Sequence, residues 1–296
     1  MSRRVGIVGL GRMGLPMCVR LAERGFAVSA TDIRPGLQTS VTEARAHWDD
    51  SAAEVAARCE VLITMLPGPH EVVGMMGEVL GALSPGCTWI DMSSATPAVG
   101  AQIALAAKGR DVRILDAPVG GGPPEARNGR LLVFAGGSAD DLGAQRDVLD
   151  SLAERVLHVG MAGSGYAVKL IVNMLWFEQA VAGAEALSLA ARAGLDLETV
   201  RLAVQESAAA SRFMQRDAPA LMTGDDLTSF SLARSHEELA GVLALGDQLD
   251  VPLALAERAT ELYAQALERY GDIDGELMAA RLVAERASVD LAAERP

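Results

Sequence analysis

The stretch "VGIVGLGRMG", residues 5–14, decides the fold of this chain. A short apolar run leads into Gly9, Gly11 and Gly14, which have the spacing G-x-G-x-x-G. Between a strand and a helix, the first glycine permits a tight turn, the second lets a pyrophosphate approach the backbone, and the third lets the helix pack on the strand. The helix N-terminus adds free N–H groups and a partial positive charge. The stretch therefore predicts the first turn of a dinucleotide-binding domain.

An acidic residue at the end of the next apolar run supports this interpretation. Asp32 lies near the end of "FAVSATDI", residues 26–33. An acid about 20 residues beyond the glycines hydrogen-bonds a ribose 2′-OH and repels a 2′-phosphate, which favours NAD. Arg34 could accept that phosphate, so NADP stays open. The alternative is a glycine-rich turn and a strand-end acid with no ligand.

Further apolar runs alternate with helical patterns in the first half of the chain. These runs are "VLITML" (61–66), "TWIDMS" (88–93), "VRILDAPV" (112–119), "LLVFAGG" (131–137) and "RVLHVG" (155–160). Such alternation predicts an α/β Rossmann-type fold, a doubly wound and mostly parallel sheet with helices on both faces.

The pattern becomes wholly helical after Gly163, beginning with a long run over 165–194. We therefore expect residues 1–162 to form the dinucleotide-binding domain. Residues 163–296 should form an all-helical substrate and oligomerisation domain, joined to the first by a long interdomain helix. The tail, 286–296, should be frayed.

Composition excludes several classes of function. The net charge of -13 argues against a nucleic-acid or membrane-surface partner, because both need clustered Lys and Arg. No segment approaches the roughly 20 apolar residues of a membrane span. Cys18, Cys59 and Cys87 form no C-x-x-C pair, which predicts a reducing, cytoplasmic location. The four histidines have no metal-ligand spacing, so we expect no metal.

Three loops follow predicted strands at the edge where open α/β sheets bind ligands. They are "LPGP" (66–69), "SSATP" (93–97) and the glycine loop 120–122. Each could be an ordinary turn, and for "LPGP" alone that is the better interpretation. The glycine loop could hold a phosphate, hold a carboxylate or merely turn. Because the cofactor phosphates already have a site at 9–14, we interpret it as the loop that holds the substrate's anion.

A nicotinamide needs a partner that exchanges a proton with the substrate oxygen. The histidines are poorly placed for this role. Lys169 and Asn173 are four residues apart in "GSGYAVKLIVNM" (163–174), so they share a helical face. An apolar setting beside a cationic nicotinamide would disfavour the ammonium form and give an acid or base that works near neutral pH. On the residues alone, a surface lysine is the more frequent outcome.

Taken together, these stretches resemble the β-hydroxyacid dehydrogenases, which are related to 6-phosphogluconate dehydrogenase. The matching pieces, in the family's order, are "GLGRMGLPM" (9–17), "MLPGP" (65–69), "DMSS" (91–94), "DAPVGGG" (116–122) with "NGRL" (128–131), and "GSGYAVKLIVN" (163–173). The resemblance implies reversible NAD(P)-linked oxidation of a small-molecule hydroxyl β to an acid group, with semialdehyde reduction in reverse. It implies that Lys169 is the general acid/base, that Asn173 supports the substrate, and that the protein is a homodimer or homotetramer.

The motifs and the resemblance give the expected site residues. Expected cofactor contacts are Gly9, Gly11, Arg12, Met13, Gly14, Asp32, Ile33, Arg34, Leu66, Pro67 and Ser94. Expected substrate contacts are Ser94, Gly120, Gly121, Gly122, Lys169, Asn173 and Trp176. Ser94 stands where the family usually has Thr.

The chain departs from the family's pattern at two places. The family's Ser-Gly-Gly loop begins here with Gly120, so a hydroxyl is lost while the N–H groups of Gly121 and Gly122 remain as a possible anion nest. A Lys-Asp pair is replaced by Glu237 and Glu238. The reversed field should tolerate a cationic or neutral substrate better than a dianion. The alternative is that the helix shifts and both glutamates are solvated.

Trp176 lies seven residues after Lys169, on the same helical face. It could form an aromatic wall for a larger or more apolar substrate, or it could simply pack in the core.

Two other functions stay open. An imine or ketimine reductase would usually have Asp or Tyr at the Lys169 position, although Glu237 and Glu238 could hold an iminium. A non-catalytic nucleotide-binding scaffold is disfavoured by the lysine.

Overall fold

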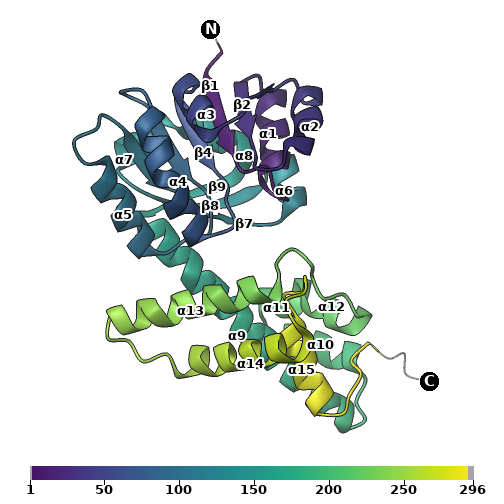
Figure 1. Cartoon of the computed structure of the whole chain (residues 1–296). Coiled ribbons are helices and arrows are strands. Elements are labelled where there is room, and N and C mark those ends of the chain that lie inside the picture. Colours follow the sequence, from purple (N-terminus) through teal and green to yellow (C-terminus); the bar gives the residue numbers. More distant parts are fainter. Residues whose placement is uncertain (1, 293–296) are drawn as a thin grey trace. The chain divides into compact units, whose positions relative to one another are not determined.

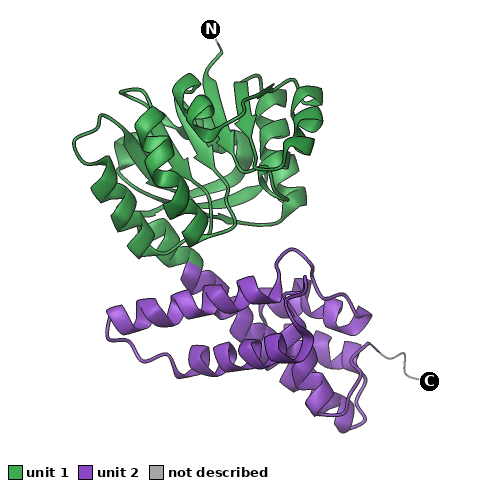
Figure 2. Cartoon of the chain, in the orientation of Figure 1, with its two compact units in different colours: residues 1–169 green, residues 170–296 purple. Residues whose placement is uncertain are grey.

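The computed structural model describes residues 2–292. The chain forms two compact units, residues 1–169 and 170–296 (Figures 1 and 2). The long helix α9 (Ser164–Arg192) begins in the first unit and ends in the second.

The first unit is built on one mixed sheet. Its strands are β1 (Arg4–Val8), β2 (Ala27–Thr31), β3 (His47–Trp48), β4 (Val61–Thr64), β5 (Thr88–Asp91), β6 (Arg113–Asp116), β7 (Val119–Gly120), β8 (Leu131–Gly136) and β9 (Ala153–Gly160). Their spatial order is β3-β2-β1-β4-β5-β6-β8-β7, with β9 paired to β8. Pairing is parallel from β3 through β6 and between β8 and β9, whereas β8 runs antiparallel to β6 and β7. The predicted mostly parallel Rossmann-type sheet is confirmed.

Helices cover both faces of this sheet (Figure 1). They are α1 (Gly14–Glu23), α2 (Gln38–Glu43), α3 (Ala52–Arg58), α4 (Pro69–Ala82), α5 (Pro97–Ala107), α6 (Pro123–Asn128), α7 (Ala139–Ala144) and α8 (Arg146–Leu152), with a 3-10 turn at Pro35–Leu37. Alternate strand residues enter separate cores: Val61 and Ile63 lie in one, and Leu62 lies in the other. Burial on both faces explains why the strands read as continuous apolar runs.

One predicted strand is divided in the structure. The run 112–119 forms β6 and β7, which are separated at Ala117 and Pro118. Proline has no N–H for the ladder and restricts the residue before it, so the run cannot continue as one strand. The Pro118 carbonyl instead accepts a hydrogen bond from the Phe134 N–H at 3.0 Å.

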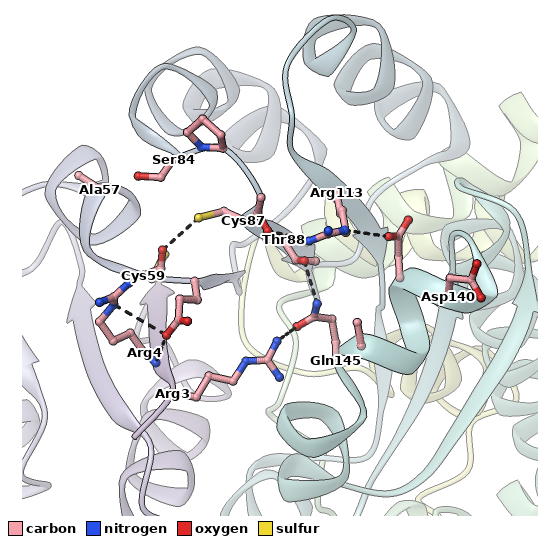
Figure 3. Close-up of a pocket in the computed structure, with 15 residues that line it drawn as sticks. Arg3, Arg4, Ala57, Cys59, Ser84, Cys87, Thr88, Arg113, Asp140 and Gln145 are labelled. Atoms are coloured by element: carbon pink, nitrogen blue, oxygen red, sulfur yellow. Dashed lines mark hydrogen bonds and ion pairs between the residues drawn. The ribbon is translucent and has the colours of Figure 1, made fainter. Parts of the chain in front are cut away.

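A pocket of about 520 Å³ lies at the amino ends of β1, β4, β5 and β6 (Figure 3). Its walls carry charged residues of both signs. Arg4 Nε lies 3.8 Å from Glu60 Oε2, and Arg113 Nε lies 3.2 Å from Asp141 Oδ1. The pocket is therefore at the edge of the sheet opposite the motif-bearing loops, and its charges are largely paired.

The second unit contains α10 (Leu197–Gln205), α11 (Arg212–Arg216), α12 (Ala218–Thr223), α13 (Leu232–Gln248), α14 (Ala254–Tyr270) and α15 (Met278–Arg286), together with most of α9. The predicted all-helical second part is confirmed. Its aromatic centre is a chain of edge-to-face contacts, Phe213 to Trp176 to Phe177 to Tyr263. No helix within residues 2–292 is long and apolar enough to cross a membrane.

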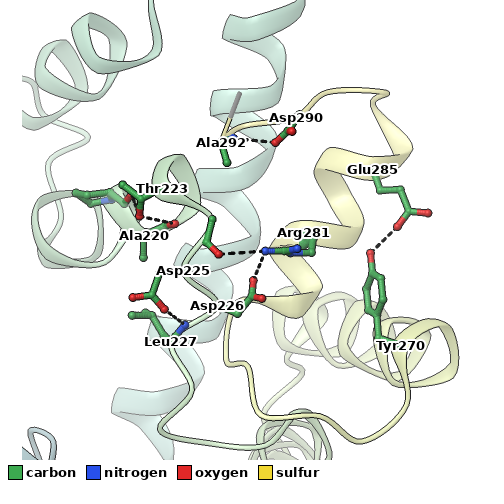
Figure 4. A network of polar contacts seen from close by, with 12 residues as sticks. Ala220, Thr223, Asp225, Asp226, Leu227, Tyr270, Arg281, Glu285, Asp290 and Ala292 are labelled. Atoms are coloured by element: carbon green, nitrogen blue, oxygen red, sulfur yellow. Dashed lines mark hydrogen bonds and ion pairs between the residues drawn. The ribbon is translucent and has the colours of Figure 1, made fainter. Parts of the chain in front are cut away.

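Polar contacts hold the C-terminal helix of this unit (Figure 4). Arg281 Nη2 lies 2.6 Å from Asp226 Oδ1, and the Tyr270 hydroxyl donates to Glu285 Oε2 at 2.6 Å. Beyond α15, Leu291 is buried in the core. The expectation that the tail frays from residue 286 is therefore wrong as far as Leu291, because apolar burial fixes it. Residues 293–296 lie outside the described part of the chain.

Candidate active site

The glycine turn after β1 is set by contacts of the backbone with itself. Gly9 has φ +91°, and a Cβ there would stand 2.4 Å from the Met65 carbonyl oxygen. A Cβ on Gly14 would stand 1.9 Å from the Gly9 carbonyl oxygen. At Gly11, by contrast, no described atom lies within 4 Å of the Cβ position. The chain itself does not need glycine at Gly11, so the open space there fits the close approach of a pyrophosphate.

The first turn of α1 begins three residues after Gly11. No side chain caps its N-terminus at Met13, and no acidic residue lies in its first turn. Uncapped N–H groups and the helix dipole favour an anion. Arg12 is exposed, whereas Met13 packs partly against the core.

Asp32 follows β2 beside the same turn. Its Oδ2 accepts a hydrogen bond from the Leu10 N–H at 2.7 Å, and its Oδ1 accepts from Arg34 Nε at 2.7 Å. Burial raises the pKa of this carboxyl, but the hydrogen bonds from Arg34 and Leu10 outweigh burial and hold the pKa below its ordinary value. Asp32 is therefore an anionic acceptor at neutral pH. The neighbouring Ile33 is 96% exposed, which leaves an apolar surface for a ligand.

The loops after β4 and β5 are tied together by one hydrogen bond. The Leu66 N–H, next to Pro67, donates to Ser93 Oγ at 2.9 Å. Ser93 is buried, whereas Ser94 is half-exposed and has no hydrogen-bond partner among residues 2–292. Ser94 is thus the hydroxyl of the pair that remains for a ligand.

The three glycines after β6 have different roles. A Cβ on Gly120 would make only an ordinary contact, 3.7 Å from Leu132 Cβ, whereas Gly121 has φ +103° and favours glycine. The Gly122 N–H donates to Glu125 Oε2 at 2.9 Å. The expectation that both N–H groups of the nest remain for a substrate anion is therefore wrong for Gly122, because Glu125 already takes that N–H.

The start of α9 is docked closely on the ends of β6 and β8. Asp116 accepts hydrogen bonds from the Gly163 N–H at 2.7 Å and from the Tyr166 N–H at 3.2 Å, so it caps the helix. A Cβ on Gly165 would stand 2.4 Å from the Phe134 carbonyl oxygen. The "GSG" of the motif is thus explained by contact between helix and sheet, and Asp116 and the two glycines fix the first turn.

Neither Asp116 nor Asp91 was identified from sequence as part of the site. Each ends a buried strand, and burial raises the pKa of both carboxyls. They are register partners on β5 and β6. An acidic residue closing an apolar run, as in "TWID" and "RILD", was the available signal.

Lys169 lies on the next turn of α9 and is half-buried, and Asn173 follows one turn later. The Asn173 amide donates to Glu238 Oε2, and Glu238 is only 8% exposed. Glu237 instead has a side chain that is 51% exposed and pairs with Arg234. The solvated alternative therefore describes Glu237 but is wrong for Glu238.

Trp176 is partly buried between two core clusters. Its indole N–H donates to Asp217 Oδ2 at 2.8 Å, and its ring packs edge-to-face on Phe177 and Phe213. Three contacts therefore fix the orientation of the indole.

Among the described residues, no group of three or more His, Cys, Asp or Glu side chains is placed to hold a metal ion.

Comparisons with known proteins agree with this geometry. Residues 4–160 match the NAD binding domain of 6-phosphogluconate dehydrogenase, and residues 163–283 match the model described as NAD-binding of NADP-dependent 3-hydroxyisobutyrate dehydrogenase. The chain is 32% identical over 266 residues to 2-(hydroxymethyl)glutarate dehydrogenase of Eubacterium barkeri, covering 88% of each protein.

Solved structures show the same similarity. The 3-hydroxyisobutyrate dehydrogenase of Mycobacterium tuberculosis, solved with L-serine, has a TM-score of 0.86 at 27% identity, covering 95% of this chain and 99% of that one. An imine reductase from Myxococcus stipitatus, with a TM-score of 0.66 at 19% identity over 95% of this chain and 100% of that one, shares the fold alone. The chain therefore belongs to the 3-hydroxyisobutyrate dehydrogenase-like family of β-hydroxyacid dehydrogenases, within the 6-phosphogluconate dehydrogenase superfamily, and is an NAD(P)-dependent dehydrogenase that acts on hydroxy acids.

Proposed function

We propose that Lys169 is the general acid/base in the reversible oxidation of a β-hydroxy acid, with Asn173 orienting the substrate. The observation that best supports this role is the position of the start of α9. Asp116 of β6 caps the helix, and Gly165 lets it approach β8 closely. Lys169 follows one helical turn later. The bound nicotinamide supplies the hydride acceptor. In oxidation, Lys169 Nζ takes the hydroxyl proton. In semialdehyde reduction, it returns that proton to the carbonyl oxygen.

The substitution Lys169→Ala tests this role. We expect turnover to fall at least about 100-fold, the lower range for a positioned acid or base. Coenzyme affinity, measured by fluorescence titration, should stay within about twofold because the glycine turn is untouched. Lys169→Arg is the matched control for charge, since it keeps a cation that does not deprotonate near neutral pH. Wild-type turnover in Lys169→Ala would disprove the assignment.

We further propose that the coenzyme is NAD. Asp32 is a buried anion that accepts hydrogen bonds, which suits a ribose 2′-OH and repels a 2′-phosphate. The Arg34 guanidinium donates two hydrogen bonds to Asp32, so these donors are not directed at a 2′-phosphate. Parallel titrations with NAD and NADP test this preference, and Asp32→Ser should shift it towards NADP. Tighter binding of NADP by the unmodified protein would reverse it.

For the substrate, we propose a hydroxy acid with one carboxylate and a bulky, neutral or cationic substituent. A side chain at Gly120 would make only ordinary contacts with the rest of the chain. The lack of a side chain there therefore leaves space that a substrate substituent could fill. Glu238 contributes a buried anion beside Asn173. The L-serine in the Mycobacterium tuberculosis structure shares the charge pattern of this class, with a hydroxyl β to a single carboxylate and a cationic amino group, although it is compact.

A substrate panel tests the class and its alternatives. Purified protein is assayed by nicotinamide absorbance with hydroxy acids, hydroxy amino acids, dicarboxylic hydroxy acids and cyclic imines. Preference for dicarboxylic acids would overturn the substrate class. Turnover of imines alone would favour an imine reductase, and coenzyme binding without any turnover would favour a scaffold.

We also propose that the protein is a homodimer or homotetramer in a reducing compartment such as the cytoplasm. The thiols of Cys18, Cys59 and Cys87 are all free and buried, which suits a reducing environment. Light scattering of the purified protein tests the oligomeric state, and a monomeric mass would contradict it.

A further inference from the structure

The Asp91 carboxylate is the meeting point of three hydroxyl groups inside the first unit. It accepts hydrogen bonds from Thr64 Oγ1, from Ser93 Oγ at 2.7 Å and from the Tyr166 hydroxyl at 2.6 Å. Asp91 is 1% exposed, and within residues 2–292 no cation lies within ion-pair distance. A buried carboxylate without a cation is costly unless hydrogen bonds satisfy it. Here hydroxyl donors do so on both oxygens.

The directions of these hydrogen bonds are fixed by N–H groups behind two of the hydroxyls. Trp89 Nε1 donates to Thr64 Oγ1 at 2.8 Å, and the Leu66 N–H donates to Ser93 Oγ at 2.9 Å. Each hydroxyl oxygen receives an N–H, so its own hydrogen points at Asp91. The hydroxyl protons of Thr64 and Ser93 are therefore both directed towards one carboxylate.

Tyr166 completes the network from a different part of the chain. Tyr166 is 1% exposed, and its ring lies against Gly100 of α5, where a Cβ would stand 3.3 Å from Tyr166 Cε2. Burial and the charge of Asp91 raise the pKa of the Tyr166 hydroxyl well above its ordinary value, so it stays a donor. Tyr166 lies one turn before Lys169 on α9.

The network thus joins two segments that the proposed reaction requires in register. On one side, Ser93 holds the Leu66 N–H and is the neighbour of Ser94. On the other side, Tyr166 belongs to the turn of α9 that precedes Lys169. Asp116 already caps the backbone of this turn, so the extra bond through a side chain is not needed to form the helix.

Resting on the proposed role of Lys169, we propose that Asp91 and Tyr166 are positioning residues. The hydrogen-bond chain Leu66–Ser93–Asp91–Tyr166 sets the Lys169 turn relative to the loops that carry Leu66 and Ser94. Loss of the Tyr166 hydroxyl leaves the ring, the helix cap and the glycine turn in place. It removes only the bond that fixes the rotation and tilt of this turn. Proton transfer depends on sub-ångström placement, so chemistry should suffer while coenzyme binding does not.

The test compares Tyr166→Phe with Tyr263→Phe in the full-length protein. Tyr263 is also fully buried, and its hydroxyl donates to the Glu276 carbonyl at 2.9 Å within the second unit. Both variants lose one buried hydroxyl, and Tyr166→Phe should lose more thermal stability because its hydroxyl donates to a carboxylate and not to a neutral carbonyl. We expect kcat to fall about tenfold in Tyr166→Phe only. Its solvent deuterium isotope effect on kcat should rise, and its coenzyme Kd should stay within about twofold.

In a second variant, Asp91→Asn, an N–H₂ group replaces one of the two acceptor oxygens. Three hydroxyl donors then face a side chain that is itself partly a donor. It should lose more kcat than Tyr166→Phe. If Asp91→Asn does not fold, Tyr166→Phe decides alone. Equal kcat and isotope effects in Tyr166→Phe and Tyr263→Phe would overturn the positioning role. Wild-type turnover in Lys169→Ala would instead overturn the proposed function, so the two failures are distinguishable.

Discussion

The glycine turn, residues 5–14, and the Asn173 cluster, which we define as Asn173, Trp176, Asp217 and Glu238, are built in different ways. In the glycine turn, backbone atoms approach so closely that a single Cβ would overlap with a carbonyl oxygen. In the Asn173 cluster, side chains hold one another: an amide contacts a carboxylate, and an indole contacts another carboxylate. Backbone contacts dictate glycine, whereas side-chain contacts can be made by several residue types.

With the Asn173 cluster in the proposed substrate site, this difference separates what the coenzyme needs from what the substrate needs. A coenzyme site made by backbone geometry is the same whatever the hydroxy acid. A substrate site made by side chains can change its charge and volume without changing the fold. The relatives agree with this division, since they match over most of the chain while their names give different hydroxy acids.

The largest effect should follow Gly14→Ala. The new methyl group would stand 1.9 Å from the Gly9 carbonyl oxygen. We expect a loss of about 3 kcal/mol in the free energy of unfolding, the upper end of ordinary overpacking. Urea unfolding measures it, and coenzyme binding should be lost with it. Unchanged stability would show that the turn can relax, and would weaken the contrast with the Asn173 cluster.

Gly11→Ala should separate coenzyme binding from folding within the same turn. Its methyl group meets no described atom within 4 Å, so the midpoint of urea unfolding should match the wild type. It would enter the space assigned to the pyrophosphate. We expect the coenzyme Kd to rise at least about tenfold, which corresponds to about 1.4 kcal/mol. Wild-type coenzyme affinity in Gly11→Ala would show that the pyrophosphate does not bind next to Gly11.

In the Asn173 cluster, Glu238→Gln should alter substrate selection but not coenzyme binding. The amide oxygen can still accept from Asn173, while the buried negative charge is removed. We expect KM for dicarboxylic hydroxy acids to fall about tenfold, or about 1.4 kcal/mol of repulsion removed. Glu237→Gln is the matched control, because that exposed residue pairs with Arg234 and should change KM less than about twofold. Equal effects of the two substitutions would contradict the assignment.

Gly120→Ser should have a smaller effect and would restore the family's hydroxyl. The fold should accept it, since the nearest atom to the Cβ is Leu132 Cβ at 3.7 Å. We expect kcat/KM to shift a few-fold towards compact hydroxy acids, the size of one neutral hydrogen bond. Ratios of kcat/KM for small and bulky substrates measure the shift. A gain for bulky substrates would remove Gly120 from the substrate site.

The smallest effect is expected at the thiols. Burial raises the pKa of Cys18 and of Cys59 to about 12, so neither forms a thiolate at pH 8. Native protein should react negligibly with a disulfide reagent such as DTNB, whereas guanidinium-unfolded protein should react at every cysteine. Rapid labelling of native protein would show that the first unit opens locally.

Much of the fold could be predicted from sequence, and so could the presence of a nicotinamide-coenzyme domain with its glycine turn. Strict G-x-G-x-x-G spacing predicted the coenzyme turn because close backbone approach admits only glycine. Alternating apolar runs predicted the sheet because buried strands are apolar on both faces. The split of the strand at Pro118 was not predicted, although proline there was its cause.

Tertiary structure alone decided the environment of each charge. Glu237 and Glu238 are identical residues next to each other in sequence. Glu237 is exposed and pairs with Arg234, whereas Glu238 is buried and accepts a hydrogen bond from Asn173. Likewise Tyr166 and Asp91 are far apart in the chain, and only the docking of α9 brings the hydroxyl to the carboxylate. Periodicity reports which face of an element is apolar, a local property. The partner of a buried polar group depends on distant segments, so the folded chain has to bring them together.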